Sequence, residues 1–377
     1  MVDPVELTRS LIRCPSVTPD AGAALDVVQE ALAALGAECH RLRFEEPGKA
    51  AVDNLYAKLG TSGPHLAFAG HVDVVPPGAA SAWSVDPFGG ELRDGMVWGR
   101  GAADMKSGVA CFVAALAAAD RSGVQISLLI TGDEEGEAVN GTVRILRWAA
   151  ERGERFDACI VGEPTCPETL GDMAKIGRRG SANARLVVFG RQGHTAYPQR
   201  ANNAAHRMVR MLSALTGEPL DSGSALFEPS TLQITTIDVG NAATNVVPAT
   251  AEARFNIRYN DLHTTASLER WLRQRCDAVG GHYELSLRSS GDAFFTEPGP
   301  LSEMLSASVE AVTGRRPELS TSGGTSDARF IRAYCPVIEF GLVGATMHQA
   351  DERVAVTDIR ALTEIYREFL GRWRAAA

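Results

Sequence analysis

The sequence predicts an α/β protein in which a doubly wound domain is interrupted by a smaller, ferredoxin-like domain. Short apolar runs alternate with helical patterns in the first half of the chain, and one more such run follows near its end. Between them the pattern changes to the order β-α-β-β-α-β. The length of 377 residues, with 45% apolar residues, suffices for two or three domains with substantial cores.

The larger domain is expected to begin with a helix. Asp3 can cap it, Pro4 suits its first turn, and Glu6 lies three residues after the cap. A second helical pattern covers 23–35 and ends at Gly36. The apolar runs that predict buried strands are 66–69, 126–130, 158–161 and 335–340, and further helices are expected near 105–120 and 141–152. Short apolar strands between helices are typical of a sheet covered on both faces.

The middle of the chain predicts a separate domain. Strands are expected at 183–189, 231–239, 251–259 and 282–288, and helices at 203–215 and 267–279. This is the order of a split βαβ, ferredoxin-like domain. We place it at residues 179–293, so that the larger domain comprises residues 1–178 and 294–377.

Charge and composition argue against several classes of partner. Asp and Glu number 46 against 37 Lys and Arg, and the net charge of -9 disfavours non-specific binding to nucleic acid or an anionic membrane. The longest apolar run, 109–119, is too short to span a bilayer. The first residues contain no apolar signal core, and the seven cysteines are scattered without a CxxC motif. We therefore expect a cytoplasmic protein with reduced thiols.

Residues of the types that bind metals recur at five places, most of them just after a predicted strand. They are His71 with Asp73, Asp104, the run 133–135, Glu163 and His348. Ligands of open α/β sheets bind at the carboxyl ends of the strands, so these side chains should converge on one edge. Converging carboxylates repel one another unless a cation compensates them, and histidines with carboxylates suit Zn²⁺ or a similar ion. Each place alone has an ordinary interpretation, such as a helix cap or a solvated turn, but their coincidence predicts a metal site.

The motifs around these residues resemble those of the zinc aminoacylase and carboxypeptidase family of metallopeptidases. They are GHVDVVP at 70–76, GRGAADMK at 99–106, DEEG at 133–136, GEPT at 162–165 and the late His348. The resemblance extends over nearly the whole chain, including the inserted domain. It implies a catalytic domain with two Zn²⁺ ions, for which Co²⁺ can substitute, and an inserted domain that serves as lid and dimerisation domain.

The resemblance also implies roles for individual residues. His71 and Glu163 would hold one zinc ion, Glu135 and His348 the other, and Asp104 would bridge both. Asp73 would orient the His71 ring. Glu134 would be the general base that takes a proton from water during amide hydrolysis and returns it to the leaving amine.

A second set of motifs is similar to a bacterial branch of the family that acts on succinylated diamino acids. These motifs are KIGRRGS at 175–181, QGHTAYP at 192–198, NVVP at 245–248 and SGGTSDARF at 322–330. They imply hydrolysis of N-succinyl-LL-2,6-diaminopimelate to succinate and LL-2,6-diaminopimelate, a step of lysine biosynthesis. The guanidinium groups of Arg178, Arg179 and Arg258 match the carboxylates of such a substrate.

The same resemblance implies the remaining substrate contacts. The positions similar to substrate-contacting ones are Ser181, Tyr197, Asn245, Gly324 and Thr325. His194 would come from the inserted domain of a partner subunit and help bind the oxyanion, which implies a homodimer whose lid closes over the substrate.

Alternatives within and outside the family remain. N-acetylornithine deacetylases, dipeptidases and carboxypeptidases share the metal motifs, although the run at 178–181 favours a longer dicarboxylic acyl group. A non-catalytic binding protein on this fold would lack some ligands, and none is missing. Serine hydrolases, dinucleotide enzymes and zincins are disfavoured because GxSxG, a complete GxGxxG and HExxH do not occur. One loop departs from the family pattern, with Leu342 and Gly344 where proline and asparagine are expected.

Overall fold

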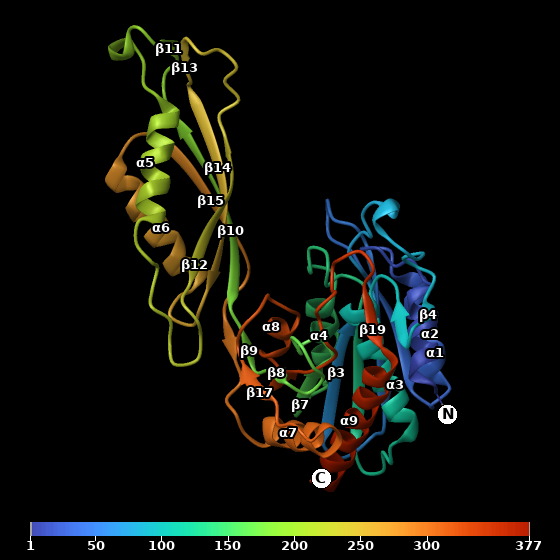
Figure 1. Ribbon diagram of the computed structural model, residues 1–377. Helices are drawn as coiled ribbons and strands as arrows, with labels where there is room; N and C mark the ends of the chain where they lie inside the picture. The colour runs from blue at the N-terminus through green and yellow to red at the C-terminus, as the bar shows by residue number, and fades with distance from the viewer. Residues whose placement is uncertain (1, 377) are drawn as a thin grey trace. The chain divides into compact units, whose positions relative to one another are not determined.

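The computed structural model describes residues 2–376, which form two compact units. The first unit comprises Met1–Ile176, Thr296–Ser320 and Ser326–Ala377, and the second comprises Gly177–Phe295 with Thr321–Thr325 (Figure 1). The second unit is thus two residues longer at each end than the predicted range of 179–293. The reason is that β9 (Gly177–Arg178) pairs with β16 (Phe294–Phe295), so that these two short strands belong to the second unit.

An eight-stranded mixed sheet is the centre of the first unit, with strand order β1-β2-β6-β3-β7-β18-β8-β17. Its strands are β1 (Glu38–Phe44), β2 (Val52–Leu59), β3 (His65–His71), β6 (Gln125–Thr131), β7 (Ala158–Val161), β8 (Met173–Lys175), β17 (Glu318–Ser320) and β18 (Val337–Glu339). The four strands expected from apolar runs, β6, β3, β7 and β18, are neighbours and run parallel. The predicted α/β fold is confirmed, with an antiparallel pair, β1 and β2, added at one edge.

Helices cover both faces of this sheet (Figure 1). They are α1 (Pro4–Ile12), α2 (Gly22–Ala33), α3 (Ser107–Ala118), α4 (Thr142–Glu151), α7 (Pro300–Thr313), α8 (Ala328–Ile331) and α9 (Val356–Ala375). On one face, Phe68 stacks on Phe112 of α3 with ring centroids 4.0 Å apart and meets Tyr366 of α9 edge-on. On the other face, Tyr56 packs on Trp148 of α4. Parallel strands covered in this way leave only their ends accessible to a ligand.

Short elements complete the first unit. They are the three-stranded sheet of β4 (Glu91–Arg93), β5 (Met96–Trp98) and β19 (Arg353–Ala355), with the turns η1 (Ala80–Ala82) and η2 (Ala102–Lys106). Helix α3 begins two residues later than expected from the sequence, because Asp104 and Met105 in η2 do not have helical backbone angles. At α1, the Asp3 carboxylate accepts a hydrogen bond from the Val5 amide at 2.9 Å, as the predicted cap requires.

The second unit contains a four-stranded antiparallel sheet in the order β12-β14-β10-β15. Its strands are β10 (Gly180–Phe189), β12 (Thr231–Asp238), β14 (Thr250–Tyr259) and β15 (Tyr283–Gly291), and its helices are α5 (Ala204–Thr216) and α6 (Thr265–Val279). A small sheet of β11 (Gly193–His194) and β13 (Val246–Val247) and the turn η3 (Pro198–Arg200) lie at the end opposite β9 and β16 (Figure 1). Buried residues of the strands, such as Leu186 and Phe255, pack with Met208 and Leu272 of the two helices. The chain order and strand order are those of a ferredoxin-like domain.

Two further expectations concern the whole chain. Among the described residues, no helix combines the length and apolarity needed to cross a bilayer. All seven cysteines are free thiols.

The aromatic cluster between the sheet and its helices allows a stability test. Phe112→Ala should lower the free energy of unfolding by about 3–5 kcal/mol, because it leaves a cavity against Phe68 and Tyr366. Leu92→Ala is the control, because Leu92 is 49% exposed and its truncation should change stability by about 0.5 kcal/mol or less. Urea unfolding monitored by circular dichroism measures both, and equal losses would contradict this account of the core.

Candidate metal centre

Histidine and carboxylate side chains gather at the carboxyl ends of β3, β6 and β7. His71 is the last residue of β3, Glu134 and Glu135 follow β6, and Glu163 follows β7. Two groups of three residues each have their ligand atoms within 4.8 Å of one another. One group is His71, Asp104 and Glu135, and the other is His71, Glu134 and Glu163. The convergence expected from the strand order is therefore present in the structure.

Asp104 lies between the two histidines. Its Oδ1 is 3.1 Å from Nε2 of His71, and its Oδ2 is 3.4 Å from Nε2 of His348. On either side a glutamate adds a further oxygen, since Glu163 Oε1 is 3.8 Å from His71 Nε2 and Glu135 Oε1 is 2.8 Å from His348 Nε2. The two histidines thus share one carboxylate, and each has a second one of its own.

The electrostatics of this cluster are those of crowded negative charge. Burial raises the pKa of Glu134 and of Glu163 well above the usual range, and the neighbouring carboxylates add to the effect. Burial also disfavours the charge of Asp104, but hydrogen bonds from His348 and His71 outweigh it and hold its pKa well below the usual range. The hydrogen bonds with Asp104 and Glu135 raise the pKa of His348 to about 10. Oxygen and nitrogen donors under this repulsion fit divalent cations such as Zn²⁺.

Asp73 contacts the His71 ring mainly through its backbone. Nδ1 of His71 lies 2.9 Å from the carbonyl oxygen of Asp73 and 3.6 Å from its carboxylate. That carboxylate accepts hydrogen bonds from the Thr18 hydroxyl at 2.6 Å and from the backbone amides of Glu134 and Glu135 at 3.3 and 3.1 Å. The carboxylate of Asp73 therefore holds the loop that carries the two glutamates, in addition to facing the ring.

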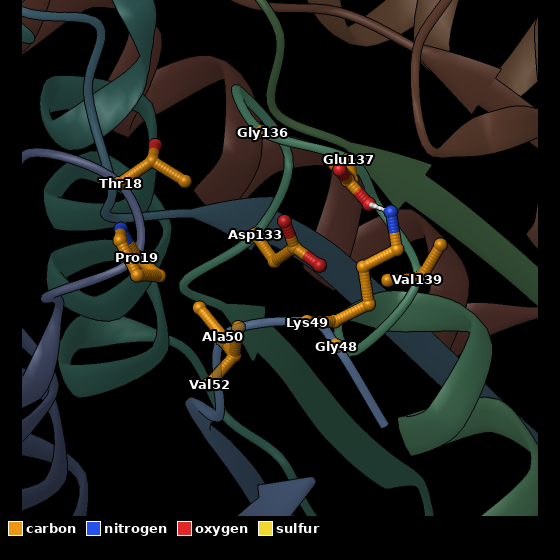
Figure 2. Close-up of a pocket in the computed structure, with 10 residues that line it drawn as sticks. All are labelled: Thr18, Pro19, Gly48, Lys49, Ala50, Val52, Asp133, Gly136, Glu137 and Val139. Carbon is orange, nitrogen blue, oxygen red and sulfur yellow. Dashed lines mark ion pairs between the residues drawn. The ribbon is translucent and has the colours of Figure 1, made fainter. Parts of the chain in front are cut away.

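A second buried carboxylate, that of Asp133, shapes the same loop from within. It accepts hydrogen bonds from the backbone amides of Ala138 at 3.2 Å and Asn140 at 2.9 Å. A Cβ atom on Gly136 would come within 2.6 Å of the Asp133 carboxylate, so this turn requires glycine. Asp133 lines a small cavity of about 210 Å³. Figure 2 shows Asp133 among the other lining residues, of which Lys49 and Glu137 form an ion pair. None of the residues assigned as metal ligands, general base or substrate contacts lines this cavity.

The loop before His348 is fixed although it departs from the family pattern. Leu342 is buried, and its carbonyl oxygen accepts a hydrogen bond from the Cys166 amide at 3.2 Å. The amide of Gly344 donates to the carbonyl oxygen of Cys166 at 3.0 Å. These bonds use only the backbone, so they hold this loop without the expected proline and asparagine.

The predicted substrate-contacting residues all belong to the second unit, where they form two groups. The first group contains Arg178, Arg179, Ser181, Arg258, Gly324 and Thr325. Ser181 and Arg258 are cross-strand partners of β10 and β14, and burial together with the nearby Arg179 charge lowers the pKa of Arg258. These residues thus provide closely spaced positive charge.

The second group lies at the other end of this unit, around β11 and β13 (Figure 1). The rings of His194 and Tyr197 meet edge-on with centroids 5.7 Å apart, and the Asn245 carbonyl oxygen accepts a hydrogen bond from the Thr195 amide at 3.1 Å. Tyr197 is 51% exposed. One copy of the chain therefore does not bring the two groups of predicted residues together.

Two further residues, one that contacts Asp73 and one that lies two positions after Asp104, were assigned no role from the sequence. Thr18 donates to Asp73, and Lys106 is fully buried with Nζ donating to the carbonyl oxygens of Leu11 and Cys14 at 2.9 Å. Burial lowers the pKa of Lys106 to about 8. Its place in the run at 99–106 was a usable signal, whereas nothing near Thr18 in the sequence indicates its contact with Asp73.

Comparisons with known proteins agree on one family. The model of a family described as Peptidase family M20/M25/M40 matches residues 67–372. The chain is 61% identical over 379 residues to a succinyl-diaminopimelate desuccinylase of Rhodospirillum centenum, with 100% of this chain and 98% of the relative covered. It is 55% identical over 385 residues to a protein of the same name from Bradyrhizobium sp. (strain ORS 278), with both chains fully covered.

Solved structures show the same fold at low sequence identity. An M20 family metallo-carboxypeptidase from Sulfolobus solfataricus has a TM-score of 0.82 at 15% identity, with 100% of both chains covered. The aminopeptidase PepT from Bacillus cereus has a TM-score of 0.80 at 19% identity, covering 99% of this chain and 98% of its own. The fold resemblance therefore extends over both units.

The crowded carboxylates predict that a divalent cation stabilises the protein. Zn²⁺ added to chelator-treated protein at 100 times its dissociation constant should raise the free energy of unfolding by about 2.7 kcal/mol. His71→Ala should remove most of this gain, because the His71 ring belongs to both sets of candidate ligands. His206→Ala, on the exposed side of α5, is the control. An undiminished gain in the His71 variant, measured by urea unfolding with and without Zn²⁺, would contradict the assignment.

Proposed function

The chain belongs to Peptidase family M20/M25/M40, and on this basis we propose that it hydrolyses N-succinyl-LL-2,6-diaminopimelate to succinate and LL-2,6-diaminopimelate. The observation that carries the proposal is the set of relatives named succinyl-diaminopimelate desuccinylase, which are 55% to 61% identical over nearly the whole chain. Such identity along both units makes a shared substrate more plausible than a shared fold alone would. The reaction belongs to lysine biosynthesis, and we place it in the cytoplasm.

We assign two Zn²⁺ ions to the carboxylate cluster, with Co²⁺ as a substitute. His71 and Glu163 would hold one ion, Glu135 and His348 the other, and Asp104 both. The position of Asp104, with one oxygen toward each histidine, supports this assignment. When bound, the ions would polarise the amide carbonyl group and lower the pKa of a water molecule.

Glu134 is the proposed general base. It is next to Glu135 in sequence, yet its carboxylate belongs to the set with His71 and Glu163 and is left over when the ligands are assigned. Burial raises the pKa of Glu134, as is useful for a carboxylate that must hold a proton before it returns that proton to the leaving amine. Glu134 takes a proton from the attacking water as the new C–O bond forms. It then delivers the proton to the amine nitrogen as the C–N bond breaks.

Substrate recognition is assigned to the second unit. Arg178, Arg179 and Arg258 would bind substrate carboxylates, with Ser181, Tyr197, Asn245, Gly324 and Thr325 as further contacts. We propose that this unit is the lid and dimerisation domain and that His194 of the partner subunit binds the oxyanion. The separation of the two residue groups within one chain supports a contribution from a second copy. The clustered arginines explain how a protein with a net charge of -9 can bind an anion.

Replacing the proposed base should separate metal binding from turnover. Glu134→Ala should retain bound zinc but lower kcat by at least about 10²–10⁴-fold, because it removes the proton acceptor and leaves the assigned ligands in place. Glu137→Gln is the matched control, since Glu137 belongs to the same loop, is exposed and pairs with Lys49. Zinc content by atomic absorption and kcat by following amide hydrolysis test this. Near-normal turnover in Glu134→Ala would refute the base assignment.

The choice of substrate is decided by comparing three compounds on the same zinc-loaded protein. We expect kcat/KM to be highest for N-succinyl-LL-2,6-diaminopimelate, lower for N-acetylornithine and lowest for simple dipeptides, because only the first carries a carboxylate on its acyl group for the arginines. A preference for N-acetylornithine would replace the proposed activity by that of a sister deacetylase. A preference for dipeptides would indicate a peptidase.

A further inference from the structure

Glu352 is a buried acid that contacts the metal centre only through the backbone around it. It lies directly before β19, and its side chain is about 1% exposed. Oε2 accepts hydrogen bonds from Arg100 Nη1 at 2.7 Å and the Gly101 amide at 3.0 Å. Oε1 accepts from the amides of Ala103 at 2.8 Å and Asp104 at 3.2 Å. Both oxygens are therefore occupied by donors and are not free to bind an ion.

These bonds connect two segments that are far apart in sequence. The donors all belong to residues 100–104, the segment that carries Asp104, whereas Glu352 lies four residues after His348. A further bond runs from the Gly99 amide to the Glu352 carbonyl oxygen at 2.9 Å. A single residue thus ties the Asp104 segment to the His348 segment.

The His348 segment has a backbone conformation that needs outside support. His348 and Asp351 have φ values of 61° and 58°, in the left-handed region that favours glycine, whereas the residue with a φ of 81° in the Asp104 segment is a glycine, Gly101. Non-glycine residues in this region persist only where surrounding contacts hold them. The His348 side chain is in addition 49% exposed, so packing around the ring cannot fix its position alone. The carboxylate of Glu352 supplies part of the missing support.

The charge of Glu352 is balanced locally. Arg100, itself 3% exposed, pairs with Oε2 and lies over the Trp83 ring at 5.2 Å. The ion pair therefore adds no net charge beside the crowded carboxylates of the centre. An amide in place of the carboxylate would direct an NH₂ group at backbone N–H donors and leave Arg100 without its anion.

We propose that Glu352 is a positioning residue that sets the separation of Asp104 and His348 and thereby the affinity for zinc. The inference rests on the proposed function, which assigns these two residues as metal ligands. Glu352 was not predicted from the sequence, because it follows a candidate ligand in the same loop and does not directly follow a predicted strand. Residues that orient metal ligands commonly change metal affinity by about 10–100-fold when they are replaced.

The test uses the full-length protein, stripped of metal and titrated with Zn²⁺ against a chelator of known affinity. Glu352→Gln should weaken zinc binding by about 10–100-fold. The matched control is Asp221→Asn in the second unit, where a carboxylate also accepts hydrogen bonds from two backbone amides, those of Gly223 and Ser230, and contacts the side chains of Asn260 and His263. It should bind zinc with wild-type affinity, although it also loses a buried hydrogen-bonded carboxylate. Urea unfolding of the metal-free proteins shows how much stability each variant loses.

A second variant keeps the inference testable if Glu352→Gln does not fold. Glu352→Asp retains the charge but is one methylene shorter, so it can satisfy only part of the donor set. If both variants fold, the zinc affinity of Glu352→Asp should lie between those of the wild type and Glu352→Gln. If only Glu352→Asp folds, its zinc affinity should be several-fold weaker than that of the wild type. Wild-type affinity in a folded Glu352 variant, or an equal loss in Asp221→Asn, overturns the inference. Absence of zinc binding by the wild-type protein would instead overturn the proposed function itself.

Discussion

Buried negative charge at one edge of the sheet is the constraint on which the rest of the first unit depends. Parallel strands β3, β6 and β7 end at this edge, and acidic residues follow each of them. A carboxylate removed from water is costly unless protons, amide groups, arginine or a cation compensate it. The raised pKa values of Glu134 and Glu163 show that the protein alone compensates them incompletely.

The buried carboxylates divide into two kinds by what their oxygens contact. Asp73, Asp133 and Glu352 accept hydrogen bonds from backbone amides and thereby hold loops in place. Asp104 and Glu135 face histidine rings instead. The carboxylates that hold loops make the close approach of Asp104 and Glu135 possible, because side chains that repel one another stay close only when their backbones are held in place. The carboxylates that hold the loops are therefore as necessary to this centre as the candidate ligands.

The sequence allowed most of the fold to be predicted, and the exceptions have physical causes. The apolar runs identified β3, β6, β7 and β18 because strands buried on both faces contain few polar residues. The sequence did not predict β1, because this edge strand contains polar residues and is mostly half-exposed. The convergence of histidines and acids followed from strand order alone. The backbone contacts of Asp73 and Glu352 did not, since they depend on how distant loops fold against each other.

The short segment Thr321–Thr325 gives the chain an unusual connectivity. The polypeptide passes between the two units at four points, after Ile176, Phe295, Ser320 and Thr325. The second unit is therefore not a simple insertion that could be removed by joining residue 176 to residue 296. Excising or exchanging it as a module would leave behind Gly324 and Thr325, two of the positions assigned to substrate binding. An exchange of this unit between relatives therefore has to include residues 321–325 together with residues 177–295.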